Sequence, residues 1–388
     1  MPDTATRPLH PARFDQAYAT VWAATLLFFG AFYTLLEPMP RYMVRAGLAD
    51  WEIGLVLGAF GAASLLGRPL AGLATDRWGT RPVLLAGALA LLVGAVAVPL
   101  TRHVGALFVL RLLQATGYVS FTTAGTALVI RLTPPEARGR RLAIFGAAAN
   151  VAITLVPALM GAALAGAPPT AAFYASGLLV LLAGGLALRI PAPPGAGAVL
   201  ARPGGPLRPL LLPMLAIALV GVGFAAFFQF VPLLAERRGG LAAGALYTIY
   251  GLGIIAARVF GGPLLDRWSV GRTLALAAVL AAGGLGLLAV GGPPGAAAVA
   301  AVLVAVGLGL SHPALLTHQA ALLPAAPGRA SAAFYMGFDL GIGAGSILLG
   351  VMLQLGGLGA LYGAAAVLTL CALPLAPLLT RQRAAIRG

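Results

Sequence analysis

Long apolar segments alternate along the chain with short clusters of arginine, proline and glycine. An apolar run of about 20 residues is long enough to cross a lipid bilayer as an α-helix. The pattern predicts helices near 17–39, 52–74, 82–100, 104–131, 141–165, 170–190, 209–234, 241–264, 273–291, 295–323, 329–354 and 358–379. We therefore expect an all-α integral membrane protein with 12 transmembrane helices.

The composition excludes a soluble globular protein. Of the 388 residues, 60% are hydrophobic and only 9% are charged, whereas an ordinary soluble domain carries about 25% charged residues. Glycine and proline lie inside the apolar runs rather than in polar tracts, which argues against disordered and collagen-like chains. Few residues remain for a folded domain outside the bilayer, so the function is expected inside it.

The positive charge of the chain reflects its orientation in the membrane. The formal net charge is +15, and all 25 basic residues are arginines, of which 17 fall in the termini and loops of one side, 5 on the other side and 3 within helices. Cytoplasmic loops carry such an excess, so we attribute the charge to topology and expect no nucleic-acid binding. An even number of helices places both termini in the cytoplasm, in a multi-pass protein of the cell (inner) membrane.

The sequence predicts neither a metal site nor a cofactor. Cys371 is the single cysteine, so no disulfide forms within the chain, and the four histidines are scattered. The chain also lacks the HExxH, GxSxG and GxxxxGK[ST] motifs. Their absence argues against an intramembrane enzyme and against an ATP-driven pump.

A repeat relates the two halves of the chain. Residues 67–78 read GRPLAGLATDRW and residues 257–268 read ARVFGGPLLDRW, with five identities at an offset of 190. Each copy lies where the second helix of its half reaches the cytoplasm, as a parallel duplication requires. We expect an N-terminal six-helix bundle (1–190), a flexible cytoplasmic linker (191–208) and a C-terminal six-helix bundle (209–388).

The repeated segment resembles the signature loop of the major facilitator superfamily, between helices 2 and 3, with a degenerate copy between helices 8 and 9. The resemblance covers essentially the whole chain and implies two pseudo-symmetric six-helix bundles. It departs from the family pattern at Ala74, where leucine is common, and at Thr80, where a basic residue is usual. The residues that carry it are Gly72, Asp76, Arg77, Gly79, Arg81, Gly262, Asp266 and Arg267.

Each residue of this loop motif has a physical role in the arrangement that the resemblance implies. Gly72 allows close helix approach, and Asp76 can face the positive N-terminus of a helix in the other half. Arg77 and Arg81 can hold the turn to carboxylates or lipid phosphates. Such contacts would exist in only one arrangement of the halves. The alternative is that these are ordinary loop charges that follow the topology rule.

Two further segments indicate the kind of transporter. Arg111-Leu-Leu-Gln114-Ala-Thr-Gly117 resembles the Arg-x-x-Gln-Gly motif of proton-driven members of the family. Pro157 and Gly161 match fragments of a pattern found in exporters. Both resemblances favour proton-coupled export.

Ionisable residues inside the membrane are candidates for proton coupling. A charge at a helix centre costs about 2.5–3.5 kcal/mol on insertion scales, so it needs a partner or a function. Asp339 is the only carboxylate well within a predicted span. The candidates for proton coupling or gating are Asp339, Arg68, Arg111, Glu37, Arg258 and His312.

The resemblance places helix 2 against helix 11 and helix 8 against helix 5. It therefore implies contacts of Arg68 with Asp339 and of Arg258 with Asn150, while a pair of Asp339 with His312 is the alternative. A contact with arginine changes the proton affinity of a buried carboxyl group, so we expect Asp339 to be a protonatable switch. A static buried ion pair is the competing interpretation.

A second proton-linked pair is predicted near the outer surface. Glu37 and Arg111 lie at similar depth on helices 1 and 4. Alternatively, Glu37 pairs with Arg41 one helical turn later, as an ordinary interfacial ion pair.

Polar and aromatic residues midway along the cavity-lining helices are the candidates for substrate contact. The cavity they predict is mostly apolar, which suits an amphipathic or lipophilic solute. These residues are Phe32, Tyr33, Gln114, Asn150, Phe228, Gln229, Tyr250, Phe334 and Tyr335.

These observations predict a secondary active transporter that exports a small amphipathic or lipophilic solute in exchange for protons, by alternating access. A proton-linked importer or a facilitator is the first alternative, and a non-transporting membrane receptor or scaffold is the second. The expected partners are the solute, protons and membrane lipids, and we expect the chain to work as a monomer.

Overall fold

The computed structural model describes residues 11–133, 137–164, 166–168, 170–190, 208–323 and 327–387. Within these ranges it does not describe the side chains of residues 11–15, 138–140, 143, 262–266, 327–328 and 383–387. The expected linker (191–208), apart from its last residue, lies outside the described residues.

The first half of the chain forms seven α-helices. They are α1 (Pro11–Thr34), α2 (Pro38–Arg45), α3 (Asp50–Trp78), α4 (Thr80–Val96), α5 (Val104–Leu132), α6 (Arg138–Ala163) and α7 (Ala171–Leu188), with a 3-10 turn η1 (Val98–Leu100) after α4. The short helix α2 is a correction to the predicted first span, which ran to residue 39. Pro38 lacks an amide hydrogen and cannot continue α1, but it is well suited to begin a new helix.

The second half is also helical. It contains the 3-10 turn η3 (Arg208–Leu210), α8 (Leu211–Arg238), α9 (Ala243–Arg267), α10 (Val270–Val290), α11 (Pro294–Leu322), α12 (Pro327–Leu370) and α13 (Leu375–Arg387). The boundaries agree with the predicted spans to within a few residues, except at the C-terminal end. There α12 joins the predicted span 329–354 to the first part of 358–379, and turn residues 371–374 separate it from α13.

The helix α12 is interrupted in its middle. In the described part of the chain, 11 segments are long and apolar enough to cross a membrane, and the last of them, Arg329–Gln382, has 54 residues. An unbroken helix of that length would measure about 80 Å, whereas the hydrocarbon core is about 30 Å thick. Gly356 and Gly357 leave the helical conformation, Gly357 with φ +67°, and they divide the segment into two parts.

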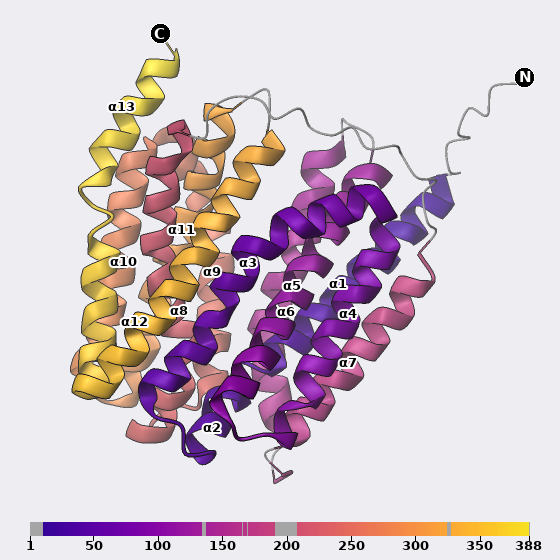
Figure 1. Cartoon of the computed structure of the whole chain (residues 1–388). Coiled ribbons are helices and arrows are strands. Elements are labelled where there is room, and N and C mark those ends of the chain that lie inside the picture. The colour runs from indigo at the N-terminus through magenta and orange to yellow at the C-terminus, as the bar shows by residue number, and fades with distance from the viewer. Residues whose placement is uncertain are drawn as a thin grey trace, which may run out of the picture.

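The two halves of the chain form two groups of helices (Figure 1). Helix α1 packs on α6 and α7, and α4 packs on α5, whereas α8 packs on α12 and α10 packs on α11. The groups meet along two seams, which we call the α3–α12 seam and the α6–α9 seam. These are the helix pairs that the resemblance implied.

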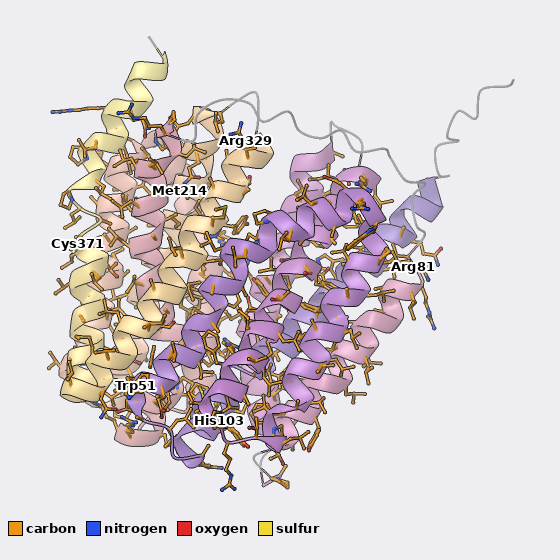
Figure 2. All side chains as sticks on the ribbon, viewed as in Figure 1. Trp51, Arg81, His103, Met214, Arg329 and Cys371 are labelled. Carbon is orange, nitrogen blue, oxygen red and sulfur yellow. The ribbon has the colours of Figure 1, made fainter. Side chains whose placement is uncertain are left out.

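The arginine-rich loops and the other loops lie at opposite ends of the helices. Trp51 and His103 lie at the lower end in Figure 2, and Arg81 and Arg329 lie at the upper end. Helix α13 also ends at the upper end (Figure 1). We use "lower" and "upper" in this sense below.

Glycines bring the helices of the α3–α12 seam into backbone contact in its lower part. A Cβ atom on Gly54 would lie 2.6 Å from the Cα of Gly350, and one on Gly61 would lie 2.6 Å from the Cα of Gly343. No side chain fits into such a space, so glycine permits the close approach.

The α6–α9 seam uses glycines at the matching positions. Gly244 and Gly251 follow Gly54 and Gly61 at the same offset of 190 that relates the repeated loops. A Cβ atom on Gly244 would lie 3.2 Å from the carbonyl oxygen of Pro157, and one on Gly251 would collide with Thr154. The duplication therefore extends to the lower contact surface of both seams.

The upper part of α3 is much less covered. Leu66, Leu70 and Leu73 are 68%, 63% and 56% exposed, whereas Ile53 and Val56 in its lower part are fully buried. The two halves are thus pressed together at their lower ends, while the upper part of α3 presents apolar side chains outward.

Candidate functional site

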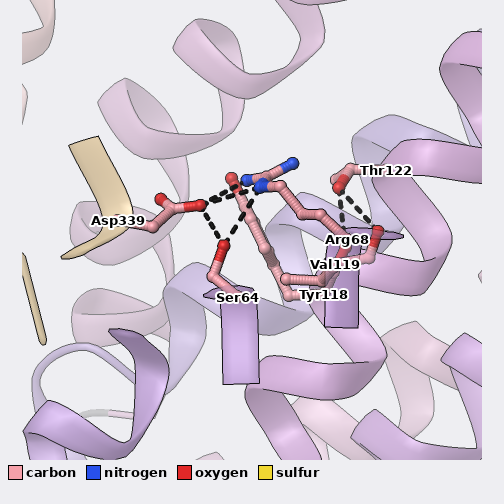
Figure 3. Close-up of polar contacts among 6 residues, drawn as sticks. All are labelled: Ser64, Arg68, Tyr118, Val119, Thr122 and Asp339. Atoms are coloured by element: carbon pink, nitrogen blue, oxygen red, sulfur yellow. Dashed lines mark hydrogen bonds and ion pairs between the residues drawn. The ribbon is translucent and has the colours of Figure 1, made fainter. Parts of the chain in front are cut away.

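A buried ion pair joins the two halves along the α3–α12 seam (Figure 3). Arg68 of α3 donates from Nη2 to Oδ2 of Asp339 on α12 at 2.6 Å, and from Nε to the same oxygen at 2.9 Å. The Asp339 side chain is only 5% exposed and that of Arg68 is 15% exposed. The contact that the sequence implied between these residues is therefore present.

Ser64 completes this contact. It lies one helical turn before Arg68 on the same face of α3. Its hydroxyl donates to Oδ2 of Asp339, and it accepts a hydrogen bond of 3.0 Å from Nε of Arg68. Three donor atoms from α3, in the first half, thus converge on one carboxylate oxygen of α12, in the second half.

Aromatic rings surround this ion pair. The guanidinium carbon of Arg68 lies 5.0 Å from the ring centroid of Tyr335, a cation–π distance. Tyr118 of α5 reaches the same place from the other side of α3 (Figure 3). The charges are therefore held in a mostly dry environment, where a paired carboxylate is far more stable than an unpaired one.

His312 is not a partner of Asp339. Its ring packs edge-on against Phe334 at 4.5 Å and against Phe338 at 5.6 Å between ring centroids. The alternative pair of the sequence analysis is therefore absent from this structure, because the aromatic residues around Asp339 occupy the space beside His312.

The predicted contact of Arg258 with Asn150 is also absent. Arg258 is exposed, and no hydrogen bond or ion pair joins these two described residues. The seam is held instead by the Thr248 hydroxyl, which donates to the carbonyl oxygen of Thr154 at 3.0 Å. At the offset of 190, Ala149 stands where the other half has Asp339, so Arg258 meets no carboxylate from α6.

A cavity of about 70 Å³ lies between the halves, beside Asp339. Side chains from five helices line it, and seven of its twelve lining residues are aromatic. They are Phe32, Tyr33, Leu36, Phe60, Arg111, Tyr118, Phe224, Phe228, Gln229, Phe338, Asp339 and Ile342.

Four of the predicted substrate-contact residues line this cavity, namely Phe32, Tyr33, Phe228 and Gln229. The other five do not, because each is packed elsewhere. Gln114 donates to the Gly94 carbonyl oxygen, and Tyr250 packs against Phe227 with the rings tilted by 30°. Phe334 is fully buried against His312, and Tyr335 lies under Arg68. Asn150 is half-buried on α6.

Arg111 and Glu37 do not form the predicted pair. Glu37 forms an ion pair with Arg41 instead, with 2.7 Å between Oε1 and Nη1, and this is the alternative that the sequence left open. Arg111 is 4% exposed, donates from Nη1 to Oε1 of Gln114 at 3.0 Å, and lies 5.5 Å from the Phe32 ring centroid. Its cationic group therefore faces the cavity without a carboxylate partner among the described residues.

Ion pairs also join the halves at the lower end. Asp50, at the start of α3, binds both terminal nitrogens of Arg237 at the end of α8, one of them at 3.0 Å. The backbone amide of Asp50 donates to Oε1 of Gln354 at 3.0 Å. Together with the glycine contacts, these bonds close the lower end.

The sequence as a whole matches the family model of the Major Facilitator Superfamily over residues 21–242 and 213–387. The chain belongs to the major facilitator superfamily. It is accordingly a multi-pass membrane transporter and not an enzyme. No curated protein sequence matches it.

Solved structures of other superfamily transporters share this fold. A bacterial homolog of the human lysosomal transporter Spinster, in an inward-facing and unoccupied conformation, has a TM-score of 0.76 at 15% identity, and the match covers 97% of this chain and 99% of that one. The D-xylose-proton symporter has a TM-score of 0.76 at 15% identity, and the match covers 94% of this chain and 97% of that one. The human organic anion transporter MFSD10 has a TM-score of 0.69 at 20% identity, and the match covers 95% of this chain and 100% of that one.

The superfamily loop motif adopts a looser arrangement than its sequence implied. A Cβ atom on Gly72 would meet nothing within 4 Å, so the expected close approach is absent. Asp76 faces Nη2 of Arg131 at 3.4 Å, at the end of α5 in its own half. Both corrections have one cause, because the upper part of α3 stands away from the other half.

The remaining motif residues are a glycine in a turn, three partly or fully exposed arginines, and two residues that lie where side chains are not described. Gly79 has φ +90° and ends α3, a conformation that favours glycine. Arg77 and Arg267 are exposed, and neither Arg77 nor Arg81 has an ion pair with a described residue. The side chains of Gly262 and Asp266 lie outside the described part. Among the described residues, no cluster of three or more histidine, cysteine or acidic side chains could hold a metal ion.

Sequence reasoning missed Ser64, which binds Asp339, and several of the cavity-lining residues of this superfamily member. Ser64 follows from a simple signal, since it precedes Arg68 by four residues. Tyr118 lies seven residues after Arg111, two helical turns along the same face of α5. Phe224 and Phe338 gave no such signal, because aromatic residues are common throughout the apolar runs.

Proposed function

We propose that this transporter exports a small amphipathic solute in exchange for protons, by alternating access. The observation that carries the proposal is the ion pair of Arg68 with Asp339. It is buried, it joins the two halves, and it lies beside the central cavity. A proton that binds Asp339 would remove the charge that holds Arg68, and the α3–α12 seam would lose its strongest polar contact.

The proposed topology has twelve spans in two six-helix bundles. The break at Gly356 and Gly357 supports two crossings for the segment Arg329–Gln382. We place the bundles at 1–190 and 209–388, joined by a cytoplasmic linker, and the upper, arginine-rich end with both termini in the cytoplasm. The protein then lies in the inner membrane, works as a monomer and contacts lipids along its exposed apolar helices.

The closed lower end supports an arrangement that opens toward the cytoplasm. Gly54 packs against α12 near the outer surface, where Asp50 binds Arg237, and Gly61 packs against α12 about two helical turns deeper. The exposed leucines of the upper part of α3 fit the same arrangement. In alternating access, the opposite state would open these outer contacts and bring the cytoplasmic parts together.

The solute class follows from the cavity lining. Seven aromatic residues face the cavity, which favours a solute with an apolar body over a densely hydroxylated one. Export rather than import is supported by the Arg111 and Gln114 motif and by Pro157 and Gly161. Proton-linked import is the second candidate.

Proton-coupled flux in liposomes tests the proposal. The purified chain is reconstituted around the pH-sensitive dye pyranine, a pH gradient is imposed, and amphipathic solutes are added one at a time. A coupled solute moves protons only in the presence of the protein, and the sign of the pH change separates antiport from import.

Asp339→Asn is the decisive variant in this assay. It keeps the size of the side chain but cannot carry a proton, so solute-dependent proton flux should disappear while binding of the solute remains. Glu52→Gln is the matched control, because Glu52 only accepts a hydrogen bond of 2.8 Å from the backbone amide of Ala49. If Asp339→Asn retained solute-dependent proton flux at the rate of the unmodified protein, Asp339 would not be the protonatable switch.

A further inference from the structure

The central cavity contains an excess of positive charge. Two guanidinium groups, those of Arg68 and Arg111, lie around it, but Asp339 is the only carboxylate among its lining residues. Asp339 forms its ion pair with Arg68, at 2.6 Å. Glu37, which lies between α1 and α2, pairs with Arg41. No carboxylate among the described residues therefore balances the charge of Arg111.

The hydrogen bonds of Arg111 are incomplete as well. Its Nη1 donates to Gln114, but its buried Nε has no hydrogen-bond partner. Gln114 is itself fixed by a hydrogen bond of 2.7 Å to the carbonyl oxygen of Gly94. A buried cation without a counter-ion is costly in a membrane, and guanidinium groups are suited to bind carboxylates. This arrangement holds the group in place for an anion that the protein does not supply.

Gln229, on the opposite wall of the cavity, has a free acceptor. The Ser346 hydroxyl donates its single proton to the Ile342 carbonyl oxygen at 2.6 Å, so it accepts from the Gln229 amide nitrogen at 2.7 Å. This fixes the orientation of the amide and leaves Oε1 of Gln229 buried without a partner. The cavity thus offers a cation from the first half and a hydrogen-bond acceptor from the second half.

We infer that the transported solute is a small organic anion with an aromatic or apolar body and a hydrogen-bond donor. Its anionic group binds Arg111, and its donor reaches Oε1 of Gln229. Such a solute contacts both halves, as a solute must if its binding is to shift the equilibrium between their arrangements. The cavity of about 70 Å³ has room for the anionic group, and the helices separate further to admit the body.

Equilibrium binding to the purified full-length chain tests this inference. The probes are salicylate, 4-hydroxybenzoate and 4-hydroxybenzenesulfonate, in which the hydroxyl group is the donor. Each is compared with its neutral counterpart, salicylamide, 4-hydroxybenzamide or 4-hydroxybenzenesulfonamide, by isothermal titration calorimetry. We expect at least one anion to bind about tenfold more tightly than its amide, since hydrogen bonds to charged groups are the stronger ones. If no anion binds more tightly than its neutral counterpart, the inference is wrong.

Two substitutions of Arg111 locate the preference. Arg111→Gln should remove it, and Arg111→Lys, which keeps the charge, should retain it with lower affinity. Arg102→Gln is the matched control, because Arg102 is an exposed arginine just before α5. A preference for anions that survives in Arg111→Gln would place the anion elsewhere and overturn the inference.

The unliganded Tm separates a binding role from a structural one. Removal of an unbalanced buried charge should leave the Tm of Arg111→Gln unchanged or raise it. A lower Tm, together with equal weakening of anions and amides, would mean that Arg111 is structural.

The inference rests on the proposed transport function, but its test does not use a proton gradient. Anion preference without coupled proton flux would refute proton coupling and leave the binding site standing. Proton-coupled flux of neutral solutes, without any preference for anions, would refute the anion site and leave proton coupling standing.

Discussion

A methyl group on Gly61 should force the outer contact of the two halves apart. The Cβ atom of an alanine at this position would lie 2.6 Å from the Cα of Gly343 and 3.0 Å from the carbonyl oxygen of Asp339. Carbon atoms in ordinary contact are about 3.5–4.0 Å apart, so the helices of the α3–α12 seam must separate by about 1 Å. Both neighbouring atoms belong to the backbone and cannot rotate away.

This clash penalises one conformation only. Overpacking of a well-packed contact raises the free energy by about 1–3 kcal/mol. The state in which the outer ends are apart has no such contact, so its free energy is unchanged. A penalty of about 2 kcal/mol shifts the equilibrium toward the outward-open state about 30-fold. Gly61→Ala should therefore increase access to the cavity from the outer side by roughly that factor.

Cysteine labelling measures this access. Cys371 is the only cysteine and is exposed, so it is first replaced by serine, and Ile342→Cys then reports from the cavity wall. A membrane-impermeant maleimide is added to the outer side, and the labelling rate is compared with and without Gly61→Ala. Gly283→Ala is the control, because a Cβ atom there meets nothing within 4 Å.

An unchanged labelling rate in Gly61→Ala would refute this reasoning, since it would mean that the backbone contact at Gly343 does not hold the outer side closed. An equal increase in Gly283→Ala would refute it as well, because the effect would then come from general loosening of the helices.

Two further substitutions test the outer ion pair and the break in α12. Asp50→Asn removes the ion pair with Arg237, which is partly exposed and contributes at most about 1 kcal/mol. Outer labelling should rise by less than about fivefold, and high salt should reduce the difference from the unmodified protein. Gly357→Ala places a side chain at φ +67°, which costs about 1–2 kcal/mol. Its Tm should fall, whereas Gly363→Ala, in open space within the helix, should not lower it.

The sequence predicted the helices because apolar length is a local pattern, whereas the pairing of helices across the two halves came from the resemblance to the superfamily. Apolar length locates each span, and the repeat around Asp76 and Asp266 relates the halves. The contact of Arg68 with Asp339 also followed, since α3 and α12 cross at the depth of both residues. Single charged residues in long apolar runs have few possible partners, so their pairing is strongly restricted.

Other features depended on packing that a single sequence does not encode. Gly72 and Asp76 were expected at a close contact between the halves, but they belong to the part of α3 that stands apart in this conformation. A sequence describes all conformations of a transporter at once, whereas a structure describes one. The possible pair of Arg111 with Glu37 is absent for a different reason, because depth along two helices does not tell which faces of them meet.

The two seams share glycines but differ in charge, and if transport is coupled to protons as proposed, this difference assigns the proton-dependent step to the α3–α12 seam. Gly54 and Gly61 have counterparts in Gly244 and Gly251, so both seams can close tightly at the outer end. Asp339 has no such counterpart, and the α6–α9 seam is joined by a hydroxyl hydrogen bond from Thr248 instead. Among the described residues of the two seams, protonation can therefore weaken only the α3–α12 seam directly. Under the proposed mechanism, the α6–α9 seam would act as the neutral contact about which the halves move, and we expect the contact between Thr248 and Thr154 not to depend on pH.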